Sequence, residues 1–154
     1  MKRGTIIKII ITSLLFTAIG GLYLTDHLIA KQYSFALIAQ SHDYIIADGV
    51  SSVRFRVELR KDDQPVPDHK IYFYASNGSL PTSRLVTNEN GYITFTYYPY
   101  LYVNDQVTPL EDVTIYLQDE SNSYFFMVPA AWDFTVPVVK PDDAQIGVDW
   151  ENLT

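Results

Sequence analysis

The sequence predicts an all-β protein: an antiparallel β-sandwich of seven to nine strands, preceded by one N-terminal transmembrane or signal helix. The first observation is a period-two alternation of apolar and polar residues in short segments, which turn-forming residues separate at intervals of roughly 8 to 15 positions. The second is a content of 12 tyrosines, because aromatic side chains suit the half-buried surface of a strand. The third is that the sequence has no helical periodicity after residue 30.

Residues 1–30 have the composition of a membrane anchor or signal segment. Lys2, Arg3 and Lys8 precede an uncharged, mostly apolar run over residues 9–24. A helix needs about 20 apolar residues to cross a bilayer, and the long side chain of Lys8 can extend the span by reaching the membrane surface. We therefore expect residues 5–24 to cross the cell membrane once, with the N-terminus in the cytoplasm and the following domain outside.

Two alternatives to a retained anchor remain open for this segment. A cleaved signal peptide would have its apolar stretch at residues 9–16 and a small-residue cleavage site at residues 18–20, and the domain would then be secreted. The start Lys2-Arg3-Gly4 also loosely resembles the leader of a type IV pilin, although Ile9 stands where such leaders usually carry Glu. A pilin-like filament subunit is therefore a further alternative.

The strands are predicted between residues 31 and 140, the bounds of the expected β-domain. The clearest is 53–60, where four apolar residues alternate with four charged ones. We expect Phe55, Phe73 and Phe95 to point into a shared core. The Asn-Gly pair at 90–91 predicts a tight turn before the strand that holds Phe95. The other strands are expected at residues 33–39, 44–46, 70–75, 85–86, 92–98, 113–117, 124–128 and 134–138. Residues 141–154 are expected to form an acidic C-terminal tail.

Three segments in order carry a resemblance to a known family. They are A-D-G-V-S at 47–51, P-V-P at 65–67 before I-Y-F at 71–73, and T-N-E-N-G-Y-I-T at 87–94. Together they resemble the bacterial immunoglobulin-like domains of the invasin and intimin type, over about residues 44–128. The resemblance implies a seven-stranded immunoglobulin-like sandwich that serves as a rigid spacer or adhesive tip on the cell surface and has no catalytic residues. Two departures are Asp63 or Gln64 in place of the family's turn glycine, and a longer connection at 97–110.

The charge balance and the chemistry-bearing residues favour a structural protein over an enzyme. The first 30 residues hold three basic residues and one acidic residue, which leaves 8 basic and 17 acidic residues beyond them, a balance that disfavours nucleic acid as a partner. Without cysteine, disulfides and thiolate chemistry are excluded. His42 and His69 are expected to be exposed turn residues, and the acidic turn at 119–122 a soluble hairpin tip. No cofactor or metal site is predicted.

The best candidate binding residues are aromatic. Tyr98, Tyr100 and Tyr102 surround Pro99, and together with Trp132 they are expected to form a contact patch, because tyrosine and tryptophan combine an apolar body with a polar tip. The expected partners are other cell-envelope or surface proteins, or a second copy of the chain, in a structural, adhesive or assembly role. One alternative is that these residues cap the open end of the sandwich. Another is a secreted module in which the rings stack on carbohydrate or a loop binds calcium.

Overall fold

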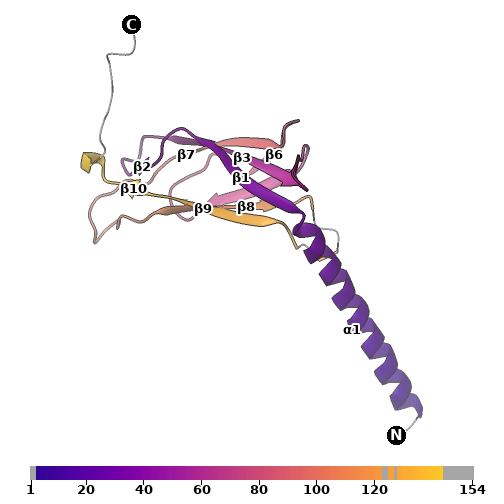
Figure 1. Ribbon diagram of the computed structural model, residues 1–154. Helices are drawn as coiled ribbons and strands as arrows, with labels where there is room; N and C mark the ends of the chain where they lie inside the picture. The colour runs from indigo at the N-terminus through magenta and orange to yellow at the C-terminus, as the bar shows by residue number, and fades with distance from the viewer. Residues whose placement is uncertain (1–2, 123–124, 127, 144–154) are drawn as a thin grey trace.

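A computed structural model describes residues 3–122, 125–126 and 128–143 of the chain. One helix, α1 (Arg3–Ala30), leads into an all-β domain (Figure 1). The strands are β1 (Tyr33–Gln40), β2 (Ile45–Ile46), β3 (Val53–Lys61), β4 (Gln64–Pro65), β5 (Lys70–Ala75), β6 (Arg84–Val86), β7 (Tyr92–Tyr97), β8 (Val113–Asp119), β9 (Ala131–Val136) and β10 (Val138–Val139). A 3-10 turn at Pro141–Asp143 follows β10.

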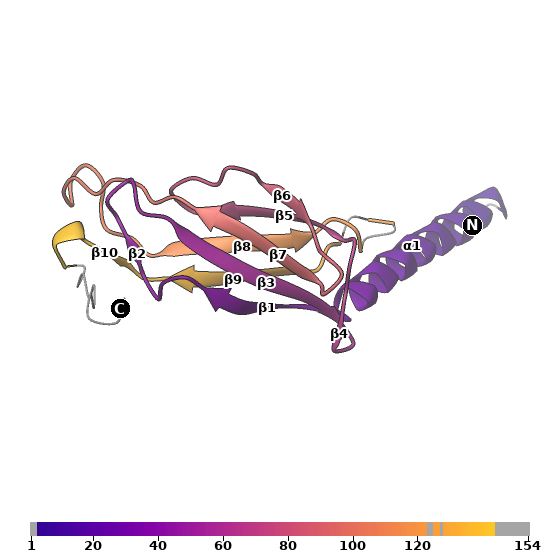
Figure 2. The same ribbon diagram turned by 90° about the horizontal axis from the view of Figure 1, so that it is seen from above.

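The strands form two facing antiparallel sheets, as Figure 2 shows from above. In the first sheet β3 is central, with β1 on one side and β7 and the short β4 also paired to it. The second sheet has the order β6-β5-β8-β9. The short strands β2 and β10 pair in parallel at one end. Within the described residues, seven strands have three residues or more, and the predicted antiparallel sandwich behind an N-terminal apolar helix is confirmed.

The core lies between the two sheets and follows the alternation of the sequence. Phe55, Phe73 and Phe95 are all buried there, as predicted, and the rings of Phe73 and Phe95 stack across the sheets with centroids 4.5 Å apart. At the turn before β7, Gly91 has a φ of +73° and lies so close to β3 that a Cβ would stand 2.8 Å from the Leu59 carbonyl oxygen. Glycine is the residue that tolerates both this left-handed backbone and this close approach.

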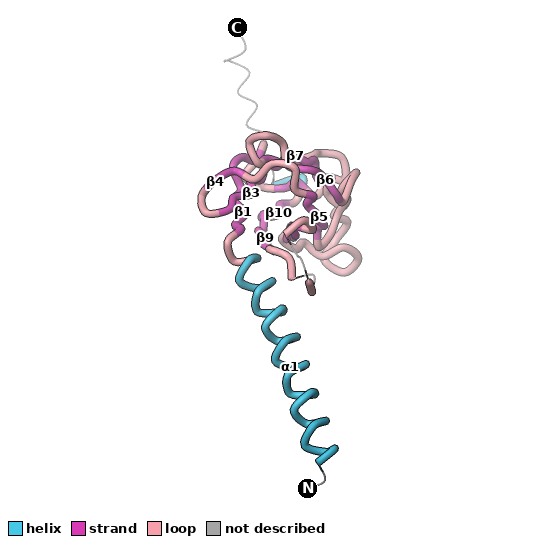
Figure 3. Tube along the Cα trace, turned by 90° about the vertical axis from the view of Figure 1, so that its right-hand side faces the viewer, coloured by secondary structure: helices cyan, strands magenta, loops and turns pink. Residues whose placement is uncertain are grey.

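Helix α1 stands out from the domain, as the cyan tube in Figure 3 shows. Its segment from Gly4 to Ala30 is long and apolar enough to cross a membrane, and its large apolar side chains are exposed outside the domain. Only the last turns touch the domain, where Asp26 and Ala30 are buried. Two residues, Lys31 and Gln32, separate the helix from β1.

The hairpin partner of β8 differs from the prediction. A strand was expected at residues 124–128, but Phe125, Phe126 and Val128 are not in a strand, and residues 124 and 127 lie outside the described residues. The partner is β9 (Ala131–Val136) instead, and residues 138–139 belong to the separate strand β10. The physical reason lies in α1, because the carboxylate of Asp26 accepts the backbone N–H groups of Phe125 and Phe126, which a β-ladder would otherwise use. Residues 144–154 of the expected acidic tail lie outside the described residues.

Candidate functional site: a tyrosine face on the second sheet

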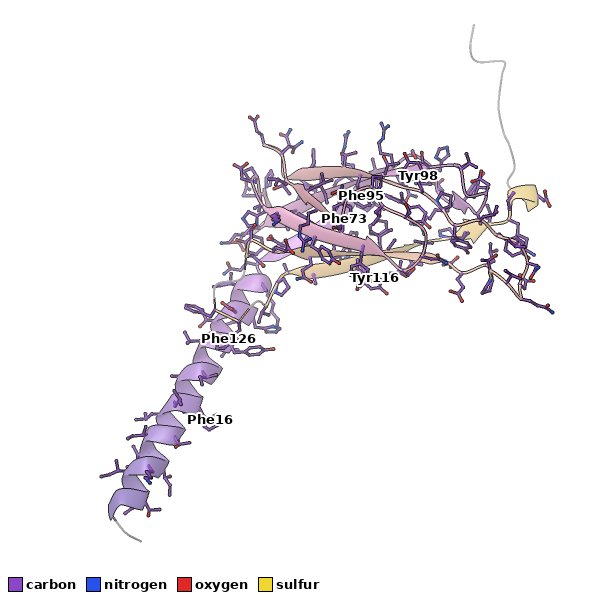
Figure 4. The ribbon with its side chains drawn as sticks, turned by 180° about the vertical axis from the view of Figure 1, so that it is seen from behind. Phe16, Phe73, Phe95, Tyr98, Tyr116 and Phe126 are labelled. Atoms are coloured by element: carbon purple, nitrogen blue, oxygen red, sulfur yellow. The ribbon has the colours of Figure 1, made fainter. Side chains whose placement is uncertain are left out.

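Three tyrosines gather on the outer face of the second sheet. On β5, Phe73 points into the core, so its neighbours Tyr72 and Tyr74 point outward. On β8, Tyr116 points outward between the buried Ile115 and Leu117. Figure 4 shows Phe73 between the sheets and Tyr116 on the outside. We call Tyr72, Tyr74 and Tyr116 the tyrosine face.

The strand register brings two of these rings together. Tyr74 lies directly opposite Tyr116 in the antiparallel pairing of β5 and β8. Their rings stack with centroids 4.7 Å apart and an interplanar angle of 14°, and Tyr72 lies 5.9 Å from Tyr74. Tyr74 remains 47% exposed and Tyr116 37% exposed. Cross-strand aromatic pairs stabilise a sheet, so the rings are held in place while one side of the pair stays open.

Charged residues border the tyrosine face at the β6 edge. The Arg84 guanidinium lies 4.8 Å from the centre of the Tyr72 ring. It also donates to the carboxylate of Glu120, from Nε at 3.1 Å and from Nη2 at 3.0 Å. This hydrogen bond holds the pKa of Glu120 below its ordinary value and raises that of Arg84. Both groups are therefore charged at neutral pH, and they give the aromatic surface a polar rim.

A shallow hollow of about 190 Å³ lies on this face. The residues that line it are mostly aromatic, small or polar: Tyr72, Tyr74, Tyr116, Leu117, Gln118, Ala131, Trp132 and Asp133. On the neighbouring strand β9, Asp133 lies opposite Tyr116, and the small Ala131 lies opposite Gln118. The arrangement can hold an apolar or aromatic group against the rings and offers Asp133 and Gln118 for hydrogen bonds.

The tyrosines predicted from the sequence lie at the opposite end of the domain from α1, and they differ in their surroundings. Tyr98 is 41% exposed just after β7. Tyr100 is part-buried, and its hydroxyl accepts the backbone N–H of Glu111 at 3.0 Å. The hydroxyl of the part-buried Tyr102 donates to Asp105 at 3.0 Å. Two of the three therefore fix the loop between β7 and β8, while Tyr98 is exposed.

Trp132 is separate from these tyrosines. It lies on β9 of the second sheet and packs toward the core, with its ring 5.2 Å from that of Phe134. In the described part of the chain it has no ring contact with Tyr98, Tyr100 or Tyr102. A partner-binding role for these four residues stays a prediction.

His69 does not occupy the exposed turn position expected for it. Its Nδ1 lies 2.7 Å from a carboxylate oxygen of Asp119, which is fully buried. The other oxygen of Asp119 accepts the backbone N–H of Ser121 at 2.8 Å. The pair links the residue just before β5 to the last residue of β8. The described residues also hold no cluster of three His, Asp or Glu side chains able to bind a metal.

Comparison with protein families and with curated proteins finds no match. Among solved structures, the D00-D0 domain of intimin is similar over 67% of this chain and 46% of its own, with 13% identity and a TM-score of 0.46. A C-terminal 282-residue fragment of intimin, solved with the intimin-binding domain of the translocated intimin receptor, is similar over 68% and 31%, with 20% identity and a TM-score of 0.47. A conjugative transposon lipoprotein from Bacteroides eggerthii is similar over 68% and 96%, with 15% identity and a TM-score of 0.43.

Intimin domains, which the sequence motifs resemble, are thus among the solved structures similar to this chain. The chain spans less than half the length of those intimin structures. The likeness, at TM-scores below 0.5, concerns the arrangement of strands alone.

Proposed function

We propose that this chain is a membrane-tethered, extracytoplasmic interaction module whose tyrosine face binds another protein of the cell envelope, in a structural or adhesive role. The observation that carries the proposal is the exposed, stacked pair of Tyr74 and Tyr116 on a sheet face. Tyrosine is enriched where proteins meet, because its ring buries a large apolar area and its hydroxyl keeps a hydrogen bond. A rigid pair loses little conformational freedom on binding, which favours affinity.

The tether rests on α1. The β-domain does not bury the large apolar side chains of α1, and a bilayer is the environment that would bury them. The basic residues lie at its N-terminal end, which favours a cytoplasmic N-terminus and an outside domain. The small-residue site at 18–20 lies in the middle of a continuous helix whose last turns pack on the domain. The turns that pack on the domain lie C-terminal to that site and would stay with a cleaved product, so the mass of the mature chain decides between anchor and signal peptide.

The direction of the tyrosine face favours a partner in the same membrane. Figure 4 places Tyr116 on the side of the domain toward which α1 projects, and Tyr98 on the opposite side. A partner bound at Tyr116 would therefore sit between the domain and the membrane plane, or beside them. Such a position suits assembly with a neighbouring envelope protein better than contact with a distant cell.

The size of the hollow favours a protein over a carbohydrate as the occupant. Pockets that enclose small ligands usually measure about 300–1,000 Å³, whereas this one measures about 190 Å³. Tyr74 and Tyr116 also cover part of each other's ring faces, and those faces are what a sugar would stack on. A protruding side chain of a protein partner fits a hollow of this size, and the Arg84–Glu120 pair can supply polar contacts at its edge.

The test is site-specific photo-crosslinking in the native envelope. Benzoylphenylalanine is placed at Tyr116 in one chain and at Tyr98 in another, because the two positions are matched in exposure, at 37% and 41%. We expect one discrete protein adduct from position 116 and none from position 98. Tyr74→Ser in the same chain should reduce that adduct several-fold, because it removes the stacked partner ring while leaving the core residues in place.

The mass of the adduct separates the alternatives. An adduct that adds a second 17.6 kDa chain would assign the face to self-association, as in a filament subunit. Equal adducts at positions 98 and 116 would remove the tyrosine face as the specific site. If no protein adduct forms and added polysaccharide raises the melting temperature, the carbohydrate-binding alternative replaces the proposal.

A further inference from the structure

Two exposed phenylalanines lie where the β-domain meets α1. Phe125 and Phe126 belong to the connection between β8 and β9, and both are exposed although they are large and apolar. The Phe126 ring meets the Tyr23 ring of α1 edge to face, with centroids 6.3 Å apart. Figure 4 shows Phe126 beside the helix, below the body of the domain. We call Phe125 and Phe126 the aromatic foot.

The position of the foot along α1 fixes its height relative to a membrane. Residues 5–24 make a span of 20 residues, and a helix rises about 1.5 Å per residue, so this span covers the roughly 30 Å of a hydrocarbon core. Tyr23 lies at the outer end of that span. Aromatic side chains concentrate at this boundary between headgroups and acyl chains. Through its contact with Tyr23, the Phe126 ring lies at the same level.

Asp26 connects the foot to the helix. Its carboxylate accepts the backbone N–H of Phe125 at 2.8 Å and that of Phe126 at 2.5 Å, and the residue is fully buried. A carboxylate just past the end of a membrane span would be costly near hydrocarbon without such bonds, and hydrogen bonds to a charged acceptor are the strong kind. The same bonds hold the foot against one side of α1 and so limit rotation of the domain about the helix.

We propose that Phe125 and Phe126 insert into the outer headgroup–acyl boundary of the bilayer that α1 spans, as a second membrane contact that sets the tilt of the domain. This inference rests on the proposed membrane tether. The remainder of the chain beyond residue 30 is strongly acidic, so attraction to anionic headgroups cannot drive the contact. Burial of the two apolar rings drives it, and a zwitterionic bilayer is sufficient.

The chain has no cysteine, so single cysteines can report depth in the full-length protein. Phe125→Cys carries the reporter, an environment-sensitive NBD fluorophore. Leu101→Cys is the matched control, because both residues are 56% exposed and Leu101 lies at the far end of the domain. Leu15→Cys, in the middle of the span, reports on the tether itself. All three labelled proteins are reconstituted in phosphatidylcholine nanodiscs containing lipids with a quencher near the headgroup end of the acyl chain.

We expect the label at position 125 to be blue-shifted and quenched several-fold more strongly than the label at position 101. Phe126→Ser in the Phe125→Cys chain should weaken that quenching, because half of the foot is lost while Tyr23 and Asp26 remain. Circular dichroism of each protein checks that the sandwich is folded.

The three labels separate failure of the foot from failure of the tether. If position 15 is in lipid while positions 125 and 101 are equally exposed to water, the foot is refuted and the tether stands. If position 15 is also in water, the membrane-tether proposal is itself refuted, and the foot with it.

Discussion

Tyr97 and Tyr100 lie three residues apart and differ in what their hydroxyl groups do. The Tyr97 ring is fully buried, and its hydroxyl has no hydrogen-bond partner among the described residues. Burial raises the pKa of this hydroxyl to about 12, which keeps it neutral. The Tyr100 hydroxyl accepts the N–H of Glu111 and faces the carbonyl oxygens of Pro109 and Glu111 at 3.3 Å. Removal of the hydroxyl should therefore change the free energy of unfolding differently at the two positions.

Tyr97→Phe is expected to leave the free energy of unfolding unchanged or to raise it by up to about 1 kcal/mol, because a buried group without a partner is removed. Tyr100→Phe is expected to lower the free energy of unfolding by about 1 kcal/mol, because the hydrogen bond from the backbone N–H of Glu111 is lost. Urea unfolding of the two variants beside the parent chain measures both. A loss of stability in Tyr97→Phe equal to that in Tyr100→Phe would show that the Tyr97 hydroxyl is bonded after all.

At the scale of elements, the contact between α1 and the β8–β9 connection decides how rigidly the domain is mounted. Asp26→Ala removes the acceptor for two backbone N–H groups, whereas Asp26→Asn keeps one carbonyl oxygen at the same place. We expect Asp26→Ala to broaden the distribution of distances between spin labels at Ile11 and Val103, measured by double electron–electron resonance. Asp26→Asn should retain most of the narrow distribution. An unchanged distribution in Asp26→Ala would place the rigidity elsewhere, such as in the short joint at residues 31–32.

Strands with a regular alternation of apolar and polar residues were predictable from the sequence. The hairpin partner of β8, near the contact with α1, was not. The strand over residues 70–75 was predicted with its observed bounds, and the one over 53–60 ends one residue later, at Lys61, because local alternation fixes both. The strand expected at residues 124–128 was wrong because its backbone donors bind Asp26, roughly a hundred positions away in the sequence. A contact of that range leaves no trace in local periodicity.

The candidate site could also be predicted only in part from the sequence. Alternation alone puts Tyr74 and Tyr116 on outer faces, because Phe73 and Ile115 point inward. Local alternation does not predict that β5 pairs with β8, nor the register that sets the two rings opposite each other. The prediction of a patch at Tyr98, Tyr100 and Tyr102 was based on the closeness of these tyrosines in the sequence. In the structure, the hydroxyls of Tyr100 and Tyr102 form hydrogen bonds within their own loop.

At the scale of the whole molecule, the last turns of α1 pack on the β-domain. If α1 is a retained anchor, the mature protein should have the mass of the full 17.6 kDa chain, remain with the membrane after salt washing and require detergent for release. Mass spectrometry of the membrane and medium fractions measures this. A soluble product that begins near Gly21 would instead support a cleaved signal peptide. The buried Asp26 and Ala30 would remain on that product, so the mass is the deciding observation.

The two-residue joint between α1 and β1 has a mechanical consequence. Under the proposed membrane tether, tension from the membrane enters the domain along β1, an edge strand whose ladder partner is β3. Antiparallel hydrogen bonds run perpendicular to their strands, so a pull along β1 loads the bonds of the ladder together instead of opening them one after another. A load applied at Tyr116, on the second sheet, must cross to the first sheet before it reaches α1. The architecture is therefore suited to resisting shear, which is the stress that the proposed tether would transmit if its partner moved beside the membrane.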